Sequence, residues 1–172
     1  MLKNLKKNNS GFTIIEVLIV LAIAGLIMLV VFLAVPALQR NQRNSGYRSE
    51  ANRVLAAAQE ISANNGGSVL TASASGTANS DAAKILTSSN AKNVTLVTVE
   101  AKGATNTAPS LTSAVLVTGA KCPSALVTIT APGAGGAGTG TVALTTGTTR
   151  QTVLVYAVED SAGAVVGQCQ ES

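Results

Sequence analysis

The sequence predicts an α+β fold, in which one long N-terminal helix packs by its second half on a mainly antiparallel sheet of about four to five strands. Three observations predict this fold. An uninterrupted apolar run lies near the N-terminus, a helical apolar stripe follows it, and short β-rich segments then alternate with Gly, Pro, Asn and Ser. The chain of 172 residues is long enough for one modest domain plus an extension.

The first element is an apolar helix. Residues 17–35 are 19 consecutive residues without a polar side chain, and as a helix they would span about 28 Å, close to the ~30 Å hydrocarbon core of a membrane. The run is longer than the core of a cleaved secretory signal, and no A-x-A-like site follows it, so a retained signal anchor is predicted. Gly25 lies inside the run and Pro36 ends it. We expect these two residues to soften or bend the helix.

Helical character resumes after Pro36. Apolar residues recur at steps of three and four, which places one apolar stripe on a helix whose other face is solvated. The sequence Asn-Asn-Gly-Gly at residues 64–67 is a strong stop signal. One helix is therefore expected from Phe12 to about Ala63, bent near Pro36, and its second half needs a partner for the stripe. The stripe consists of Tyr47, Ala51, Val54, Ala58 and Ile61.

The sheet is predicted from short β-rich runs after residue 67. Residues 80–86 are expected to form a short helix with Ser80 or Asp81 as its N-cap. The β-rich runs are too closely spaced for crossover helices, so the sheet should be mainly antiparallel, and one of its faces can cover the helical stripe. The glycine-rich residues 132–140 lack the Gly-Lys-Ser/Thr of a phosphate loop and are interpreted as a strand connection. The expected strands are residues 93–101, 111–118, 125–131, 141–146 and 152–159.

Composition and charge exclude several classes of function. The chain has no histidine, which removes the commonest general base and metal ligand, and its carboxylates are not clustered. We therefore expect no enzyme, no metal site and no cofactor. Two phenylalanines and two tyrosines are too few to support nucleic-acid binding as the main function. The net charge of +4 divides between both sides of the apolar run, so the positive-inside rule leaves its orientation open. The basic residues that flank the run are Lys3, Lys6 and Lys7 before it, and Arg40, Arg43, Arg48 and Arg53 after it.

The two cysteines, Cys122 and Cys169, enclose 46 residues and form no metal or redox spacing. A disulfide between them is predicted, and in the chain-entropy model a loop of this size stabilises the fold by about 4 kcal/mol. The alternative is two unpaired buried thiols. A disulfide requires an oxidising compartment, which would place the C-terminal domain outside the cytoplasm.

Glu16 is a carboxylate beside the start of the apolar run. At the N-terminus of a helix it interacts favourably with the helix dipole. Inside a membrane it costs a few kcal/mol unless it is paired, which makes it a functional candidate.

The N-terminal segment resembles the class III signal peptides of type IV pilins and pseudopilins. The matching features are a short basic leader, Gly11, Phe12, a glutamate four residues after Phe12 and an uninterrupted apolar helix. They cover about the first 30 residues, and the expected architecture and the late cysteine pair agree with the resemblance more loosely. The resemblance implies the ladle-like pilin fold. Its parts would be a leader (1–11), a membrane or filament-core half-helix (12–38), an amphipathic half-helix (39–64) and a β-rich head (65–172).

The resemblance also implies how the subunit is processed and assembled. A prepilin peptidase would cut between Gly11 and Phe12 and methylate the new amine of Phe12. The subunit would wait as a single-pass protein of the cytoplasmic membrane, with its N-terminus in the cytoplasm and its head outside. Inner-membrane assembly machinery would then polymerise it into an extracellular pilus, a helical homopolymer for which nucleic acid is only a possible ligand. In the filament core, Glu16 would meet the amine of a neighbouring subunit, because a buried charge is tolerated only when it is paired.

Two other classes of function stay open. A pseudopilin of a type II secretion or competence system shares this N-terminus, although pseudopilins often lack the late disulfide and carry acidic calcium sites. Here only Glu159 and Asp160 are adjacent acids. A monomeric, signal-anchored domain that binds a ligand or the cell wall would instead keep its lysine-rich leader. The chain also departs from the pilin pattern, because Leu33 stands where many pilins carry a helix-softening proline. Flexibility is therefore expected at Gly25 and Pro36.

Overall fold

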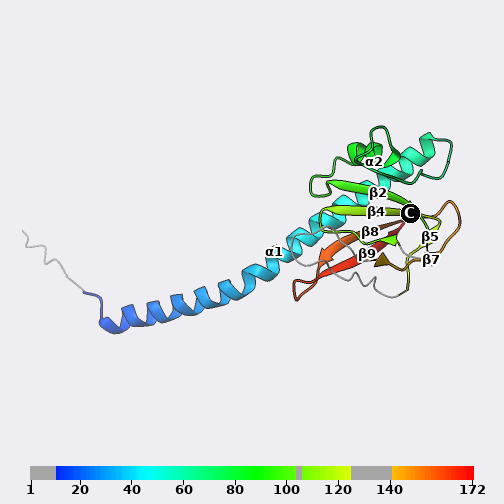
Figure 1. Cartoon of the computed structure of the whole chain (residues 1–172). Helices are drawn as coiled ribbons and strands as arrows, with labels where there is room; N and C mark the ends of the chain where they lie inside the picture. The colour runs from blue at the N-terminus through cyan, green and yellow to red at the C-terminus, as the bar shows by residue number, and fades with distance from the viewer. Residues whose placement is uncertain (1–10, 104–105, 125–140) are drawn as a thin grey trace, which may run out of the picture. The chain divides into compact units, whose positions relative to one another are not determined.

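The computed structural model of the chain describes residues 11–103, 106–124 and 141–172. The chain divides into two compact units, residues 1–39 and residues 40–172. Helix α1 (Ile14–Asn64) contributes to both units, and the second unit holds helix α2 (Asp81–Ser89) and every strand found among the described residues (Figure 1). The α+β class predicted from the sequence is confirmed.

Helix α1 is continuous from Ile14 to Asn64, with Pro36 inside it. Proline removes one helical hydrogen bond, yet the helix is not interrupted there. The helix ends where the sequence predicts. Gly66 and Gly67 adopt positive φ angles of 70° and 75°, and the N–H of Gly67 donates to the carbonyl of Ser62 over 2.8 Å. A left-handed conformation of this kind favours glycine, and it satisfies carbonyls that the helix end leaves without donors.

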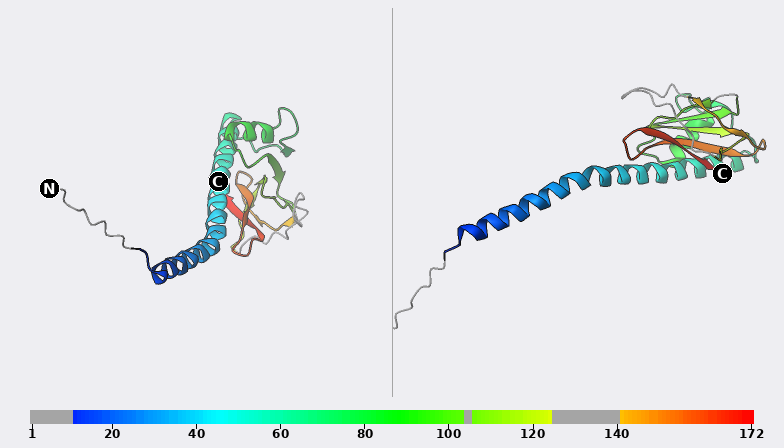
Figure 2. Two further views of the ribbon diagram at one scale, coloured as in Figure 1. Left: turned by 90° about the vertical axis from the view of Figure 1, so that its left-hand side faces the viewer. Right: turned by 90° about the horizontal axis from the view of Figure 1, so that it is seen from below.

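Within the second unit, α1 buries one stripe of apolar side chains against the central sheet. Figure 2 shows the cyan half of the helix running alongside this sheet. The stripe predicted from the sequence is confirmed, with Tyr47 partly buried at its beginning. Helical periodicity places these residues on one face, so a single sheet covers all of them. The buried apolar residues of α1 are Ala51, Val54, Leu55, Ala57, Ala58 and Ile61.

The central sheet has five strands in the order β1-β2-β4-β8-β9. Its neighbours are antiparallel except for β2 and β4, which pair in parallel. A mainly antiparallel sheet is thus confirmed, but the parallel pair was not predicted. Parallel strands need a long connection, and here that connection contains the two-residue strand β3 in place of a helix. The strands are β1 (Ser73–Ala74), β2 (Leu96–Ala101), β4 (Ser113–Thr118), β8 (Thr152–Glu159) and β9 (Val165–Glu171).

The C-terminal strand β9 was absent from the predicted strands. Its sequence carries a glycine, two glutamines and a glutamate, so it lacks the apolar alternation that marks a strand. It forms because β8 offers a long partner, and the two strands pair in register from Val153–Glu171 to Glu159–Val165. The hydrogen-bond partner, rather than the apolar pattern of the segment, determines this strand.

Two small sheets replace the single strand expected at residues 141–146. Strand β3 (Asn106–Thr107) pairs with β6 (Thr141–Val142), and β5 (Ala120–Lys121) pairs with β7 (Thr145–Thr146). The expectation of one continuous strand was wrong, because the two ends of the run pair with different partners. The strand expected at residues 125–131 and the glycine-rich connection at 132–140 lie outside the described residues.

The central sheet is buried on both faces. One face packs on α1 and α2, and the other packs on residues of the two small sheets and of the loops beside them. Side chains of a strand alternate between the two faces, so β8 is buried along six consecutive residues. Leu154, Tyr156 and Val158 face the helices, whereas Val153, Val155 and Ala157 face the opposite side.

The short helix predicted at residues 80–86 is confirmed as α2. Ser80 is its N-cap, and the Ser80 hydroxyl accepts a hydrogen bond from the N–H of Ala83 over 3.1 Å. The helix ends at Asn90, which adopts the left-handed conformation with φ 48°. The side chains of α2 that face inward, among them Ile85, complete the core on the helix side of the sheet.

Candidate functional site

The predicted cleavage site lies just before α1. Gly11, Phe12 and Thr13 are outside the helix and exposed to solvent. Phe12 is 88% exposed, and a Cβ added at Gly11 would meet no heavy atom within 4 Å. The peptide bond between these two residues is therefore open to an enzyme. The lysines of the predicted leader lie outside the described residues.

Thr13 and Glu16 form a capping box at the N-terminus of α1. The backbone N–H and the hydroxyl of Thr13 both donate to Oε2 of Glu16, over 2.9 and 2.7 Å. The N–H of Glu16 lies 3.4 Å from the Thr13 hydroxyl oxygen. In such a box the two side chains satisfy N–H groups that the first turn leaves without partners. The spacing Thr-x-x-Glu is readable in the sequence, but the capping box was not predicted.

Glu16 keeps one carboxylate oxygen available. Its hydrogen bonds with Thr13 both involve Oε2, and Oε1 makes no hydrogen bond with the described residues. The carboxylate borders a shallow apolar concavity of about 330 Å³, whose other lining residues are Phe12, Val17, Val20 and Leu21. A charged oxygen beside an apolar surface needs a partner when that surface is covered.

The described residues of the first unit present an apolar surface with no cover. Residues 11–39 are all exposed, and the large apolar side chains among them include Leu18, Ile23 and Phe32. Helix α1 is long and apolar enough to cross a membrane at this end. An exposed apolar surface of this extent marks a contact with lipid or with other proteins. Gly25 and Pro36 both lie on it, within the continuous helix.

A comparison with known families decides what this segment is. The prokaryotic N-terminal methylation motif matches residues 6–32. Residues 6–32 carry the class III signal peptide of type IV pilins. The match places Phe12 and Glu16 inside the motif, and it supports a pilin-like or pseudopilin-like protein. No curated protein and no solved structure gives a significant match to the chain.

Outside the class III signal peptide, Cys122 and Cys169 form a disulfide. Their Cα atoms are 5.7 Å apart, and both residues pack against the core on the side of the sheet that faces away from α1. Cys169 belongs to β9, whereas Cys122 directly follows β5. The bond therefore connects the last strand of the central sheet to one of the small sheets.

The arginines that follow the class III signal peptide have partners in the second unit. Arg43 pairs with Glu159 over 2.7 Å, and this hydrogen bond and charge raise the pKa of Arg43. Asn44 binds the backbone of Glu159 through both its amide atoms, and Arg40 donates to the carbonyl of Ser161. These contacts join α1 to the turn between β8 and β9. The charges in the sequence could not predict these contacts, because the partners are more than 110 residues apart in the chain.

Farther along α1, Glu50 is a buried carboxylate, although it lies outside the predicted apolar stripe and was therefore expected on the solvated side of the helix. It is 3% exposed and accepts hydrogen bonds from the N–H and the side-chain amide of Asn93 and from the N–H of Val94, over 2.8 to 2.9 Å. Arg53 lies 3.7 Å from the same carboxylate. Glu50 therefore attaches the loop between α2 and β2 to the long helix.

The described residues hold no group of three or more His, Cys, Asp and Glu side chains that could bind a metal ion. The candidate site is the N-terminal segment that matches the methylation motif. It consists of the exposed Gly11–Phe12 peptide bond, a carboxylate with one available oxygen, and an apolar helix surface.

Proposed function

We propose that the chain is a structural subunit of a type IV pilus, held in the cytoplasmic membrane and then polymerised through the apolar half of α1. The observation that carries this proposal is the methylation motif at residues 6–32, which includes Glu16 and leads directly into the exposed apolar helix. The disulfide between Cys122 and Cys169, near the C-terminus, favours a pilin over a pseudopilin, since pseudopilins often lack such a disulfide. The methylation motif and the exposed apolar helix suit a structural protein better than an enzyme.

Processing comes first. A prepilin peptidase cuts between Gly11 and Phe12 and methylates the amine of Phe12, which leaves a chain of 161 residues (172 minus the leader of 11). The exposure of both residues supports access of the peptidase. The parts of the processed chain are then the half-helix 12–38 in the membrane, the half-helix 39–64 and the head formed by residues 65–172.

Membrane residence comes second. The apolar half of α1 is as long as a hydrocarbon core is thick, so lipid covers it before assembly. The head lies outside the cytoplasm, where the disulfide between Cys122 and Cys169 is stable, and the N-terminus lies in the cytoplasm. Gly25 and Pro36 are the points at which this half of the helix can soften when it leaves the lipid.

Assembly comes third. Inner-membrane machinery moves subunits into a filament in which neighbouring apolar half-helices cover one another. Oε1 of Glu16 then accepts a hydrogen bond from the methylated amine of a neighbouring subunit. The amine and the carboxylate of one chain belong to the same first turn of the helix, so pairing between two chains is the more natural geometry. The pair is tolerated in a low-dielectric core, whereas either charge alone would be costly. Nucleic acid remains at most a ligand of the assembled pilus.

Two measurements test this function. Intact mass and N-terminal sequencing of the membrane-extracted protein should give a chain that begins at methylated Phe12. Filaments sheared from the cells should contain this chain as their main component. A chain that begins at Met1 would contradict the proposal and favour a monomeric anchored domain. Processed protein that never appears in surface filaments would favour a pseudopilin.

A further inference from the structure

The second unit contains a cleft of about 280 Å³ at the end where α1 finishes. Leu55, Ala58 and Leu70 form apolar walls, and Val69 lies at the opening with half of its surface exposed. In the described part of this unit, Val69 and Leu96 are the large apolar side chains left exposed. Its volume lies at the lower end of the range for small-molecule pockets, and a few small side chains of a protein segment would fill it.

Arg150 lines the same cleft from the turn that leads into β8. Its side chain is exposed and makes no hydrogen bond or ion pair with the described residues. A guanidinium beside a cleft with partly apolar walls is suited to a carboxylate on the incoming surface. The cleft therefore selects a partner segment that is small, partly apolar and acidic.

The turn between β8 and β9 has these properties. Residues 161–164 are exposed, and two of them, Ala162 and Ala164, are small and apolar. Asp160 precedes them, and its Oδ1 accepts the N–H groups of both alanines over 2.8 Å. Its Oδ2 makes no hydrogen bond with the described residues. The neighbouring Glu159 is already occupied by Arg43, so Asp160 is the carboxylate that this turn can offer.

We propose that the β8–β9 turn of one copy docks in the cleft at the end of α1 in the next copy. Ala162 and Ala164 then lie against Val69, and Asp160 faces Arg150. This inference rests on the proposed function, because it describes how the heads of polymerised subunits meet.

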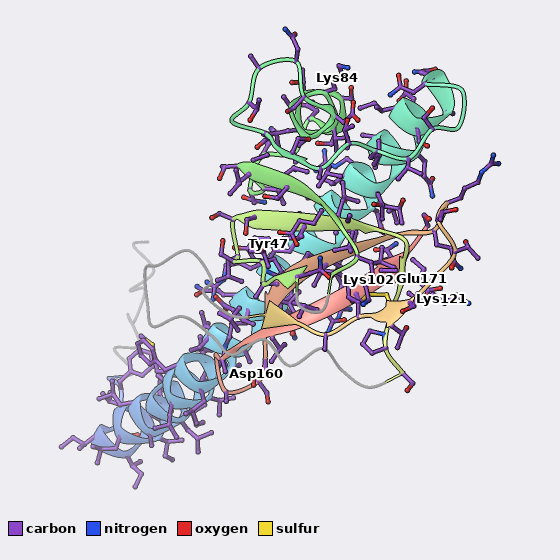
Figure 3. All side chains as sticks on the ribbon, turned by 45° about the vertical axis from the view of Figure 1, so that its right-hand side comes forward. Tyr47, Lys84, Lys102, Lys121, Asp160 and Glu171 are labelled. Atoms are coloured by element: carbon purple, nitrogen blue, oxygen red, sulfur yellow. A yellow bond between two sulfur atoms is a disulfide. The ribbon has the colours of Figure 1, made fainter. Side chains whose placement is uncertain are left out.

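The positions of the two surfaces support an open assembly. Arg150 precedes β8 and Asp160 follows it, so they are separated by about 26 Å of extended strand. Figure 3 shows Asp160 and Glu171 at opposite ends of the β8–β9 pair, and Ser172, next to Glu171, lines the cleft. A contact between different surfaces of identical subunits is heterologous, and it produces a filament when the rotation does not close a ring.

Cysteine cross-linking tests the contact in assembled filaments. The full chain is expressed in its own cells with Val69→Cys and Ala162→Cys together, and sheared filaments are oxidised and separated without reductant. We expect a ladder of dimers, trimers and higher multimers. Both native cysteines in the chain are already joined to each other, so they do not contribute to the ladder. The matched control combines Val69→Cys with Ser88→Cys on the exposed face of α2, and it should give monomer only.

Filaments of the double variant without a ladder would overturn the docking while leaving the proposed function intact. If the unsubstituted chain forms no filaments, the proposed function fails and the docking fails with it. A ladder in the control as well as in the test variant would also count against the docking, because it would show contact without selectivity.

Charge reversal provides a second measurement that does not depend on cysteines. Arg150→Glu should lower filament yield roughly two- to fivefold, the effect of one exposed ion pair. Asp160→Lys alone should lower it similarly, because it places a cation opposite Arg150. The two changes together should restore the yield. A double variant that assembles no better than either single variant would overturn the proposal, whatever the cross-linking gives.

Discussion

Glu16 and Glu50 are two carboxylates on the same helix, and their surroundings differ. Glu50 is buried, and both its oxygens are occupied by Asn93, Val94 and Arg53 of the second unit. Glu16 is exposed on an apolar surface and uses one oxygen for its own capping box. Glu50 has all the partners that a buried carboxylate needs within the fold. Glu16 uses only Oε2 within the described residues, and we propose that Oε1 pairs with a group of another molecule.

The same difference extends to the apolar side chains on either side of residue 40. Beyond it, α1 buries a stripe against the sheet, and before it every described side chain is exposed. Tertiary packing provides most of the stability of helices in proteins, so the second half of α1 is stabilised within the chain. The described residues of the first half have no such packing within the chain.

The largest effect is expected at Glu16. Glu16→Ala should still be cleaved and inserted, but the filament yield should fall to about one-tenth or less, because the neighbouring amine would be buried without a partner. Glu16→Gln separates the two roles of this side chain, since glutamine serves in a capping box but carries no charge. If assembly requires the charge, both variants fail. Filament yield is measured by shearing and quantitative blotting.

The matched control for Glu16 is Thr13→Val, which removes the hydroxyl donor and keeps the carboxylate. This variant should assemble at close to the normal level. Normal yield from Glu16→Ala would contradict the role of Glu16 in assembly. Normal yield from Glu16→Gln with failure of Glu16→Ala would reduce that role to helix capping.

The disulfide is expected to give the next largest effect, on the second unit alone. Cys122→Ser with Cys169→Ser should lower the free energy of unfolding of the head by about 4 kcal/mol in the chain-entropy model. Urea unfolding of the detergent-extracted full chain, followed by the circular dichroism of the sheet, measures it. Cleavage at Gly11 should be unchanged, because the leader is not part of the head. An unchanged urea midpoint would contradict the prediction.

The third effect concerns the buried carboxylate. Glu50→Ala should lower the free energy of unfolding by about 2 kcal/mol, because the N–H groups of Asn93 and Val94 lose their acceptor. Glu60→Ala is the matched control, since Glu60 lies exposed on the same helix and should change stability by less than about 0.5 kcal/mol. Thermal unfolding measures the stability of both variants. Equal losses of stability in Glu50→Ala and Glu60→Ala would show that the buried position of Glu50 contributes no extra stability.

Much of the fold follows from local patterns in the sequence. The stripe from Tyr47 to Ile61, the stop after Asn64 and the Ser80 cap can each be recognised within a few residues, so they were predictable. The partners of Glu50 and Arg43 lie 43 and 116 residues away, and no local pattern specifies them. Strand β9 likewise depends on β8 for its formation.

The candidate site shows the same limit. Gly11, Phe12 and Glu16 are recognisable because they occur together in a short motif, and the Thr13–Glu16 box is recognisable by its spacing. The cleft beside Val69 combines the end of a helix, a loop and a turn that are up to about 100 residues apart. A surface of this kind becomes visible only in the folded chain.

The smallest effect concerns Asp81, a carboxylate intermediate between Glu16 and Glu50. It is 8% exposed and accepts hydrogen bonds from the hydroxyl and the backbone N–H of Thr71, with Lys84 at 3.7 Å. These hydrogen bonds lower the pKa of Asp81. A depressed pKa in the folded state adds stability above the ordinary aspartate pKa of about 3.9, and this stability is lost as the pH falls through the folded value.

Thr71→Val removes the hydroxyl and keeps the backbone donor. We expect it to lower the free energy of unfolding at pH 7 by about 1 kcal/mol. The pKa of Asp81 should move back toward its ordinary value, so the acid-induced loss below about pH 4 should be smaller than in the unsubstituted chain. Urea unfolding between pH 2 and pH 7 measures both effects, with Ser88→Ala as a control on the exposed face of α2. If Thr71→Val leaves the acid-induced loss unchanged, the pH dependence arises from another carboxylate, and Asp81 differs little from an exposed acid.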